Sequence, residues 1–79
     1  MKNKMYVIRD RKSNLYGTPF VSHNDNCAKR EFNAFCKMSN NAYLAEDCEL
    51  YYVGEIDNES GIIEAPEKPV FLMNFCPEV

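Results

Sequence analysis

One segment of this 79-residue chain, residues 25–38, has the apolar spacing of an amphipathic helix. Its apolar side chains recur at i, i+4, i+7 and i+8, and so share one stripe; they are Ala28, Phe32, Phe35 and Cys36. The polar run 22–26 before them contains side chains that accept hydrogen bonds from the free N–H groups of a helix start. We therefore predict a single helix over residues 25–38.

The other apolar runs are short, rich in β-branched and aromatic residues, and separated by turn residues, which is typical of antiparallel strands. They cover residues 5–8, 15–21, 49–57 and 62–65. Gly17 and Pro19 restrict the second run to an edge or a bulged course, because proline cannot donate to a strand ladder. The third run has apolar residues on both alternating faces and is predicted to be central.

Polar turns connect these runs as hairpins. Residues 9–14 close the first hairpin, and the cationic tip 11–14 is predicted to be its most exposed point. Residues 57–61 close the second, with Gly61 suited to a positive φ. Residues 70–75 are too apolar for a free tail, so they either add a strand or pack across an open sheet face.

The sequence thus predicts one α+β domain over residues 1–79, in which a small antiparallel sheet of β-β-α-β-β order carries one helix on one face, followed by an apolar C-terminal segment. A chain this small buries only about 60% of the surface that its unfolded form exposes, so a partner would add stability. Apolar residues are predicted to put the second face against another copy, as a homodimer. They are Tyr6, Ile8, Tyr51, Val53 and residues 71–75.

Charge divides the chain into two unlike halves. Residues 1–38 contain eight lysines and arginines against three acids, whereas residues 39–79 contain one lysine against nine acids. A polyanion could therefore bind the first half and would be repelled by the second. The simpler interpretation is that both charge runs are solvated surfaces, and the pI near 5 argues against a dedicated DNA-binding protein.

The first half also combines cations with aromatic rings, the two side-chain types that bind single-stranded nucleic acid. Cations neutralise phosphates, and rings stack on unpaired bases. The candidate residues are Lys4, Tyr6, Arg9, Arg11, Lys12, Tyr16, Lys29 and Arg30. A duplex reader would need more groove-reaching residues on the helix than this chain offers. The alternative is that Tyr6 and Tyr16 belong to the core and that the cations solubilise the protein.

Catalytic and metal-binding motifs are absent from the sequence. The four cysteines form no Cys-x-x-Cys pair and His23 is the only histidine, so we expect reduced thiols that fill apolar space, no metal and no cofactor. Cys27 and His23, four residues apart at a helix start, are the one thiol–imidazole pair. Without an oriented base or an oxyanion site, we expect no enzyme.

No apolar run reaches the ~20 residues of a membrane span, and the apolar run near the start of the chain is too short to be the core of a signal peptide. We therefore expect a soluble protein that makes no contact with membranes and stays in the compartment where it is made.

Several short motifs, in this order and spacing, resemble the small nonstructural protein of gokushovirus-type microviruses, tailless bacteriophages with circular single-stranded DNA genomes. The motifs are MYVIRD (residues 5–10), YGTPF (16–20), AKREF (28–32) and AEDCELYYVGEID (45–57), followed by Ser60 and Gly61. The resemblance covers residues 4 to 64. Residues 70–75 depart from the charged or short ending expected in that family.

That family is commonly labelled as DNA-binding or replication-associated. The resemblance implies the host cytoplasm, reduced thiols and a role like that of the small microvirus protein that shifts synthesis from double-stranded replication to single-stranded genome production. Our first hypothesis is a non-enzymatic phage accessory protein that binds single-stranded DNA. The alternative is a protein-interaction module whose acidic half and residues 70–75 dock on the viral replication initiator, a scaffold or a host factor.

Overall fold

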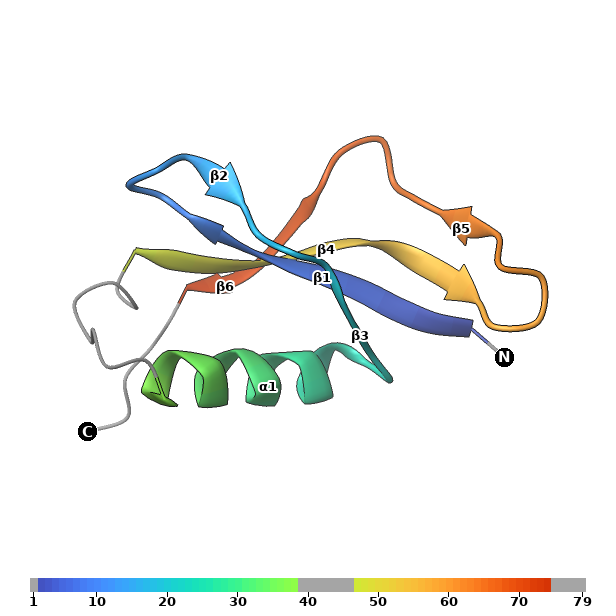
Figure 1. The fold of residues 1–79 in the computed structure, drawn as a ribbon, viewed down its shortest axis with the longest axis horizontal. Coiled ribbons are helices and arrows are strands. Elements are labelled where there is room, and N and C mark those ends of the chain that lie inside the picture. The colour runs from blue at the N-terminus through green and yellow to red at the C-terminus, as the bar shows by residue number, and fades with distance from the viewer. Residues whose placement is uncertain (1, 39–46, 75–79) are drawn as a thin grey trace.

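The computed structural model describes residues 2–38 and 47–74, which form a curled antiparallel sheet with one helix on one face (Figure 1). The elements are β1 (Lys2–Asp10), β2 (Leu15–Tyr16), β3 (Phe20–Ser22), α1 (Asp25–Met38), β4 (Cys48–Asp57), β5 (Ile63–Glu64) and β6 (Val70–Asn74). The predicted α+β class is therefore confirmed. In the part of the chain so described, no helix is long and apolar enough to cross a membrane.

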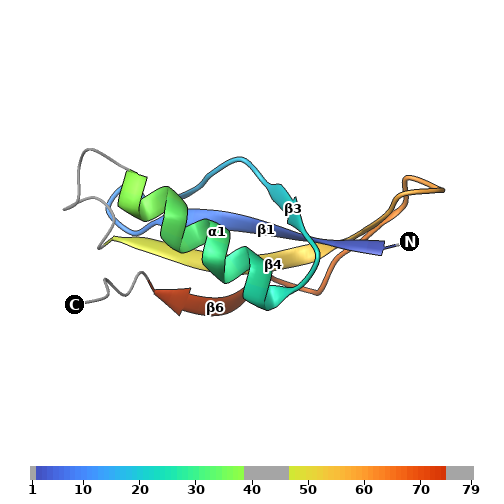
Figure 2. The same cartoon turned by 90° about the horizontal axis from the view of Figure 1, so that it is seen from below.

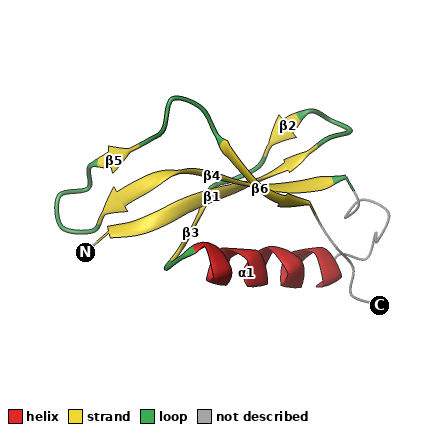
Figure 3. Cartoon of the chain, turned by 180° about the vertical axis from the view of Figure 1, so that it is seen from behind, coloured by secondary structure: helices red, strands yellow, loops and turns green. Residues whose placement is uncertain are grey.

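The centre of the sheet is the long antiparallel pair of β1 and β4 (Figure 3). Their register runs from Lys2 opposite Asp57 to Asp10 opposite Cys48. Strands β2 and β3 pair with the other side of β1, and β5 and β6 pair with the other side of β4. The prediction that the 49–57 run is a central strand is confirmed.

The predicted second strand, residues 15–21, divides into two short edge strands. Pro19 lies in the gap between β2 and β3 and has no N–H for a ladder. The N–H of Gly17 donates to the carbonyl of Ile8 (2.8 Å), which keeps the gap against β1. Among the described residues, with β6 added along β4, the sheet has six strands rather than the four of the predicted β-β-α-β-β order. Phe75 lies outside the described residues.

Helix α1 has the bounds that its apolar spacing predicts. Asn24 caps its start, because its Oδ1 accepts a hydrogen bond from the N–H of Cys27 (2.9 Å) and its carbonyl accepts one from Ala28 (3.0 Å). The helix then lies along one face of the sheet, as Figure 2 shows.

The core fills the space between α1 and the central strands. Its buried residues are Tyr6, Ala28, Phe32, Cys36 and Leu50, with Ile8, Phe20, Cys48, Tyr52, Leu72 and Met73 packed around them. The buried residues of the helix, Ala28, Phe32 and Cys36, are thus spaced four apart along it. Phe35, predicted to lie on the buried stripe, is 56% exposed, because the sheet covers a narrower arc of the helix than the stripe spans.

Strand alternation decides which side chains meet the helix. Tyr6, Ile8, Leu72 and Met73 were expected on the second face, and for these four residues the prediction is wrong, because they belong to or pack against the cluster beneath α1. Tyr51, which lies between the helix-facing Leu50 and Tyr52, does belong to the second face.

Both predicted hairpin turns are present. In the first, Asn14 has φ 59°, and its N–H donates to the carbonyl of Asp10 (2.8 Å). In the second, Gly61 has φ 75°, and Asp57 Oδ1 accepts from the N–H of Glu59 (2.9 Å). The hydrogen bonds that the Asp57 carboxylate accepts from the backbone N–H groups of Glu59 and Ser60 lower the pKa of Asp57. Asparagine and glycine occupy the positive-φ positions of these two turns because they adopt that conformation at little cost.

Candidate nucleic-acid interface

Helix α1 lies on one side of the sheet (Figure 1), and we call the opposite side the open face. Three aromatic side chains that we call the aromatic row cross it: Tyr16, Tyr51 and Phe71. Tyr16 and Tyr51 meet edge-to-face with ring centroids 5.5 Å apart, and Tyr51 and Phe71 meet in the same way at 5.6 Å. Such edge-to-face contacts fix the rings relative to one another.

Two rings of this row are half exposed. Tyr16 retains 49% and Phe71 48% of its surface, whereas Val7, the partner of Tyr51 on β1, is 5% exposed. Since α1 lies on the other face, the side chains of the open face must cover Val7. The row therefore has a packed floor and an accessible upper surface.

Arg9 lies beside this row and is held by three contacts. Its Nη1 is 2.8 Å from Glu49 Oε1, its Nη2 donates to the side-chain oxygen of Asn14, and its guanidinium carbon is 5.8 Å from the ring centroid of Tyr16. The hydrogen bond to Glu49 raises the pKa of Arg9. The result is a planar cation fixed against an exposed ring.

The tip of the β1–β2 hairpin (residues 11–14) continues this surface. Arg11 and Lys12 are both exposed there. The backbone N–H of Arg11 donates to the carbonyl of Asp47 (2.8 Å), and Lys12 Nζ is 3.8 Å from Asp47 Oδ2. Asp47 thus anchors the tip to the start of β4, leaving the two cations at the end of the sheet.

The residues predicted to bind nucleic acid do not form one surface. Arg9 and Tyr16 lie on the open face next to Arg11 and Lys12. The other cations are on or beside the helix: Lys29 and Arg30 belong to α1, and Lys4 is 3.9 Å from the Asp25 carboxylate. Lys4 and Arg9 are five residues apart on β1, so strand alternation puts their side chains on opposite faces of the sheet.

Tyr6 requires a correction. It was expected to stack on a base, but it has no exposed surface, and its hydroxyl donates to Asp25 Oδ1 at 2.7 Å. Burial, followed by this hydrogen bond, raises its pKa. Tyr6 is therefore a core residue that ties β1 to α1, as the alternative interpretation of the sequence had it.

Sequence reasoning missed Tyr51 and Phe71 as site residues. Alternation along 49–57 puts Tyr51 and Tyr52 on opposite faces, which is a signal in the sequence. It does not say which face the helix covers, and the pairing of Phe71 with Tyr51 is a long-range contact.

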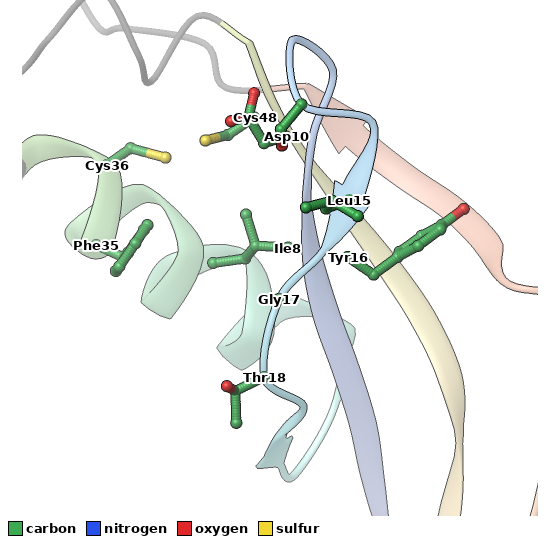
Figure 4. A pocket seen from close by; sticks show the side chains of 10 residues that line it. Ile8, Asp10, Leu15, Tyr16, Gly17, Thr18, Phe35, Cys36 and Cys48 are labelled. Atoms are coloured by element: carbon green, nitrogen blue, oxygen red, sulfur yellow. The ribbon is translucent and has the colours of Figure 1, made fainter.

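A hollow of about 650 Å3 lies on the helix side of the sheet, between the first hairpin and α1 (Figure 4). Leu15 and Phe35 line it, and the thiols of Cys36 and Cys48 point toward each other at its end. Burial, and then Cys48, raise the pKa of Cys36 to about 12. Cys27, Cys36 and Cys48, the described cysteines, form no disulfide. A thiol with so high a pKa is a poor nucleophile and behaves as apolar filler.

The predicted thiol–imidazole pair lies at the other end of the helix. His23 and Cys27 line one small hollow of about 270 Å3 together with Glu31. Within residues 2–38 and 47–74, no group of three histidine, cysteine or acidic side chains is arranged to hold a metal ion. The cysteine-enzyme hypothesis is tested by Cys27→Ser, which should leave phage yield unchanged if the thiol has no catalytic role.

Neither the curated proteins nor the solved structures gave a match to this chain. A family model described as Phage ORF5 protein does match, over residues 3–77, which covers the helix and all the described strands apart from Lys2 at the start of β1. Because this match spans nearly the whole chain, the protein belongs to the Phage ORF5 protein family.

Proposed function

We propose that this protein is a non-enzymatic accessory protein of gokushovirus-type phages that binds single-stranded DNA in the host cytoplasm. There it would act in viral genome replication, or in the switch to single-stranded genome production. Membership of a phage protein family supports the setting. The observation that carries the binding proposal is the guanidinium of Arg9 fixed against the half-exposed ring of Tyr16, next to a cationic hairpin tip.

Single strands fit this surface better than duplex DNA. Unpaired bases offer faces that stack on aromatic rings, whereas paired bases do not. The helix is a poor candidate for an element that reads duplex DNA. Phe35, a large exposed apolar residue on α1, has no group that could form a hydrogen bond with a base edge, and few cations accompany it. The open face and the hairpin tip therefore form the proposed interface.

The ion pairs around this surface do not prevent phosphate binding. The side chain of Lys12 is 68% exposed, and its Nζ lies 3.8 Å from Asp47 Oδ2. Because an ion pair with so exposed a lysine contributes little to the stability of the fold, a phosphate can replace Asp47 as the partner of Lys12 at small cost. Arg9 is held more tightly, with side-chain exposures of 23% for Arg9 and 12% for Glu49, so it serves mainly to position Tyr16.

Fluorescence anisotropy with a labelled strand of about 30 nucleotides, and with the matching duplex, tests the proposal across a salt series. If Arg11 and Lys12 at the hairpin tip are the cations that contact phosphates, log affinity falls against log salt with a slope of about −1.4. The double reversal Arg11→Glu/Lys12→Glu should weaken binding strongly. The matched reversal Lys29→Glu/Arg30→Glu, on the helix, should not.

Absence of binding at low salt would contradict the proposal, and so would a salt slope near zero. An equal loss of DNA affinity in the two double variants would show that the interface is the whole basic half of the chain and not the hairpin tip.

The end of the sheet beyond the helix favours a second candidate function (Figure 1). There Ile62 and Ile63 are 62% and 55% exposed amid acidic side chains. We propose it as the docking surface for a viral replication protein, a scaffold or a host factor if DNA is not bound. A pull-down from infected cells should lose its partner with Ile62→Ser/Ile63→Ser and retain it with Arg11→Glu/Lys12→Glu.

We also propose that the protein forms a homodimer. The half-exposed rings of Tyr16 and Phe71 on the open face would pack against a second copy of the chain. Sedimentation velocity at two protein concentrations decides between a monomer and a dimer. A dimer that single-stranded DNA dissociates would indicate that both use the open face.

A further inference from the structure

The aromatic row spans the sheet from the edge strand β2, across central β4, to the edge strand β6. We infer that it is a stacking platform for unpaired bases of pyrimidine-rich single-stranded DNA, with Tyr51 and Phe71 as base-contacting residues. This inference rests on the proposed function and names the side chains and the substrate class. Tyr51 and Phe71 lie in the acidic half of the chain, which charge alone would exclude.

The rings are held in place before any base arrives. Tyr16 contacts both the guanidinium of Arg9, 5.8 Å from its ring centroid, and the ring of Tyr51, 5.5 Å away. The Tyr51 hydroxyl lies 3.5 Å from Glu49 Oε1, and Phe71 rests on Tyr51 at its backbone pairing position. Binding to rings that are already ordered loses less side-chain entropy than binding to free ones.

The tilt between neighbouring rings selects the kind of strand. Tyr16 and Tyr51 are inclined to each other by 75° and Tyr51 and Phe71 by 72°, whereas neighbouring bases in a stacked strand lie parallel. Bases that rest on successive rings must therefore leave their own stack. Thymine runs lose little on unstacking and adenine runs lose more, so the platform should prefer oligo-dT to oligo-dA.

Charge separates the platform from the phosphate contacts. On the open face, Arg9 and Glu49 neutralise each other at 2.8 Å, so the row offers ring surface rather than net charge. Phosphates would instead meet Arg11 and Lys12 at the hairpin tip. The two contributions can be separated, because a strand without bases retains the second and loses the first.

Anisotropy titrations of the full chain with labelled oligo-dT, oligo-dA and an abasic strand, each of about 12 nucleotides, test the platform. We expect oligo-dT to bind most tightly and the abasic strand at least about fivefold more weakly. Phe71→Leu should weaken oligo-dT binding at least about fivefold while leaving the abasic affinity unchanged.

The matched control is Phe35→Leu, the same substitution at a similarly exposed phenylalanine on the opposite layer (56% against 48%). It should leave oligo-dT affinity within about twofold of wild type. Tyr51→Leu, which removes the central ring of the row, should also weaken oligo-dT binding at least about fivefold. Circular dichroism of each variant shows that it is folded.

The outcomes distinguish this inference from the proposed function. Failure of the wild-type chain to bind any single strand overturns both. Tight wild-type binding to oligo-dT with an unchanged affinity for Phe71→Leu overturns the platform alone, as does equal binding of the abasic strand. If Phe71→Leu instead converts a dimer to a monomer with oligo-dT affinity intact, the row is a self-association surface.

Discussion

The hydroxyl of Tyr6 donates a 2.7 Å hydrogen bond to the carboxylate of Asp25, the first residue of α1. The contact joins the middle of β1 to the start of the helix across 19 residues. It gives a buried polar atom a charged acceptor and places that carboxylate at the positive end of the helix dipole. The contact thereby ties the start of the helix to the face of the sheet on which Tyr6 lies.

Tyr6→Phe removes that hydrogen bond and keeps the ring in the core. Because hydrogen bonds to charged groups are stronger than neutral ones, and Asp25 can be rehydrated, we expect a loss of about 1–2 kcal/mol in the free energy of unfolding. Urea unfolding followed by circular dichroism measures it. Tyr16→Phe, at the exposed end of the aromatic row, is the control and should change stability by less than about 0.5 kcal/mol.

The same contact predicts a pH dependence. The pKa of Tyr6 in the folded protein is raised above its ordinary value of 10.0, so the neutral phenol is favoured by folding. Its contribution to stability is therefore fully present below pH 10 and is lost as the pH rises through the folded pKa. The stability difference between wild type and Tyr6→Phe should be constant from about pH 7 to about pH 9 and shrink above about pH 10. A difference that grows with pH would contradict the assignment.

Phe32 is the helix residue on which the core depends most. It has no exposed surface and lies between Ala28 and Cys36 on the buried line of α1. Phe32→Ala should cost about 3–5 kcal/mol, which is comparable with the whole stability of a core this small. Thermal melts should therefore show Phe32→Ala largely unfolded at 25 °C. Phe35→Ala, on the exposed side, should melt within a few degrees of wild type.

Gly54 controls the approach of β5 to β4. Its φ is 153°, and a Cβ at this position would lie 2.5 Å from the carbonyl oxygen of Glu64. Because a backbone oxygen cannot move aside as a flexible side chain would, Gly54→Ala should displace β5 and cost more than about 1 kcal/mol. Hydrogen exchange should show faster exchange of the Asp57 N–H, which bonds to Ile62. Unchanged exchange there would show that the strands tolerate the methyl group.

Local sequence signals predicted the elements well where the signal lies in neighbouring residues. Apolar spacing and the cap at Asn24 locate the helix, and the turn chemistry of Asn14 and Gly61 locates both hairpins. The division of residues 15–21 into two strands follows from Pro19, but its pairing depends on the course of β1. Where two segments must meet to define a feature, the sequence alone could not predict it.

The candidate site shows the same limit more sharply. Arg9, Arg11, Lys12 and Tyr16 are close in the sequence and were predicted together. Tyr6 was misassigned because a ring flanked by cations has the same local pattern whether strand alternation turns it outward or inward. Phe71 joins the site through its pairing with Tyr51, 20 residues away, which no local pattern encodes.

The most direct test of the account is chemical-shift mapping of the 15N-labelled protein during titration with oligo-dT. We predict that shift changes concentrate in β1, β2, β4 and β6, around Arg9, Tyr16, Tyr51 and Phe71, and at the tip around Arg11 and Lys12. The outer surface of α1 around Arg30 should be unaffected. Shift changes confined to α1, or none at a ligand excess, would contradict the claim that the open face of this sheet binds single-stranded DNA.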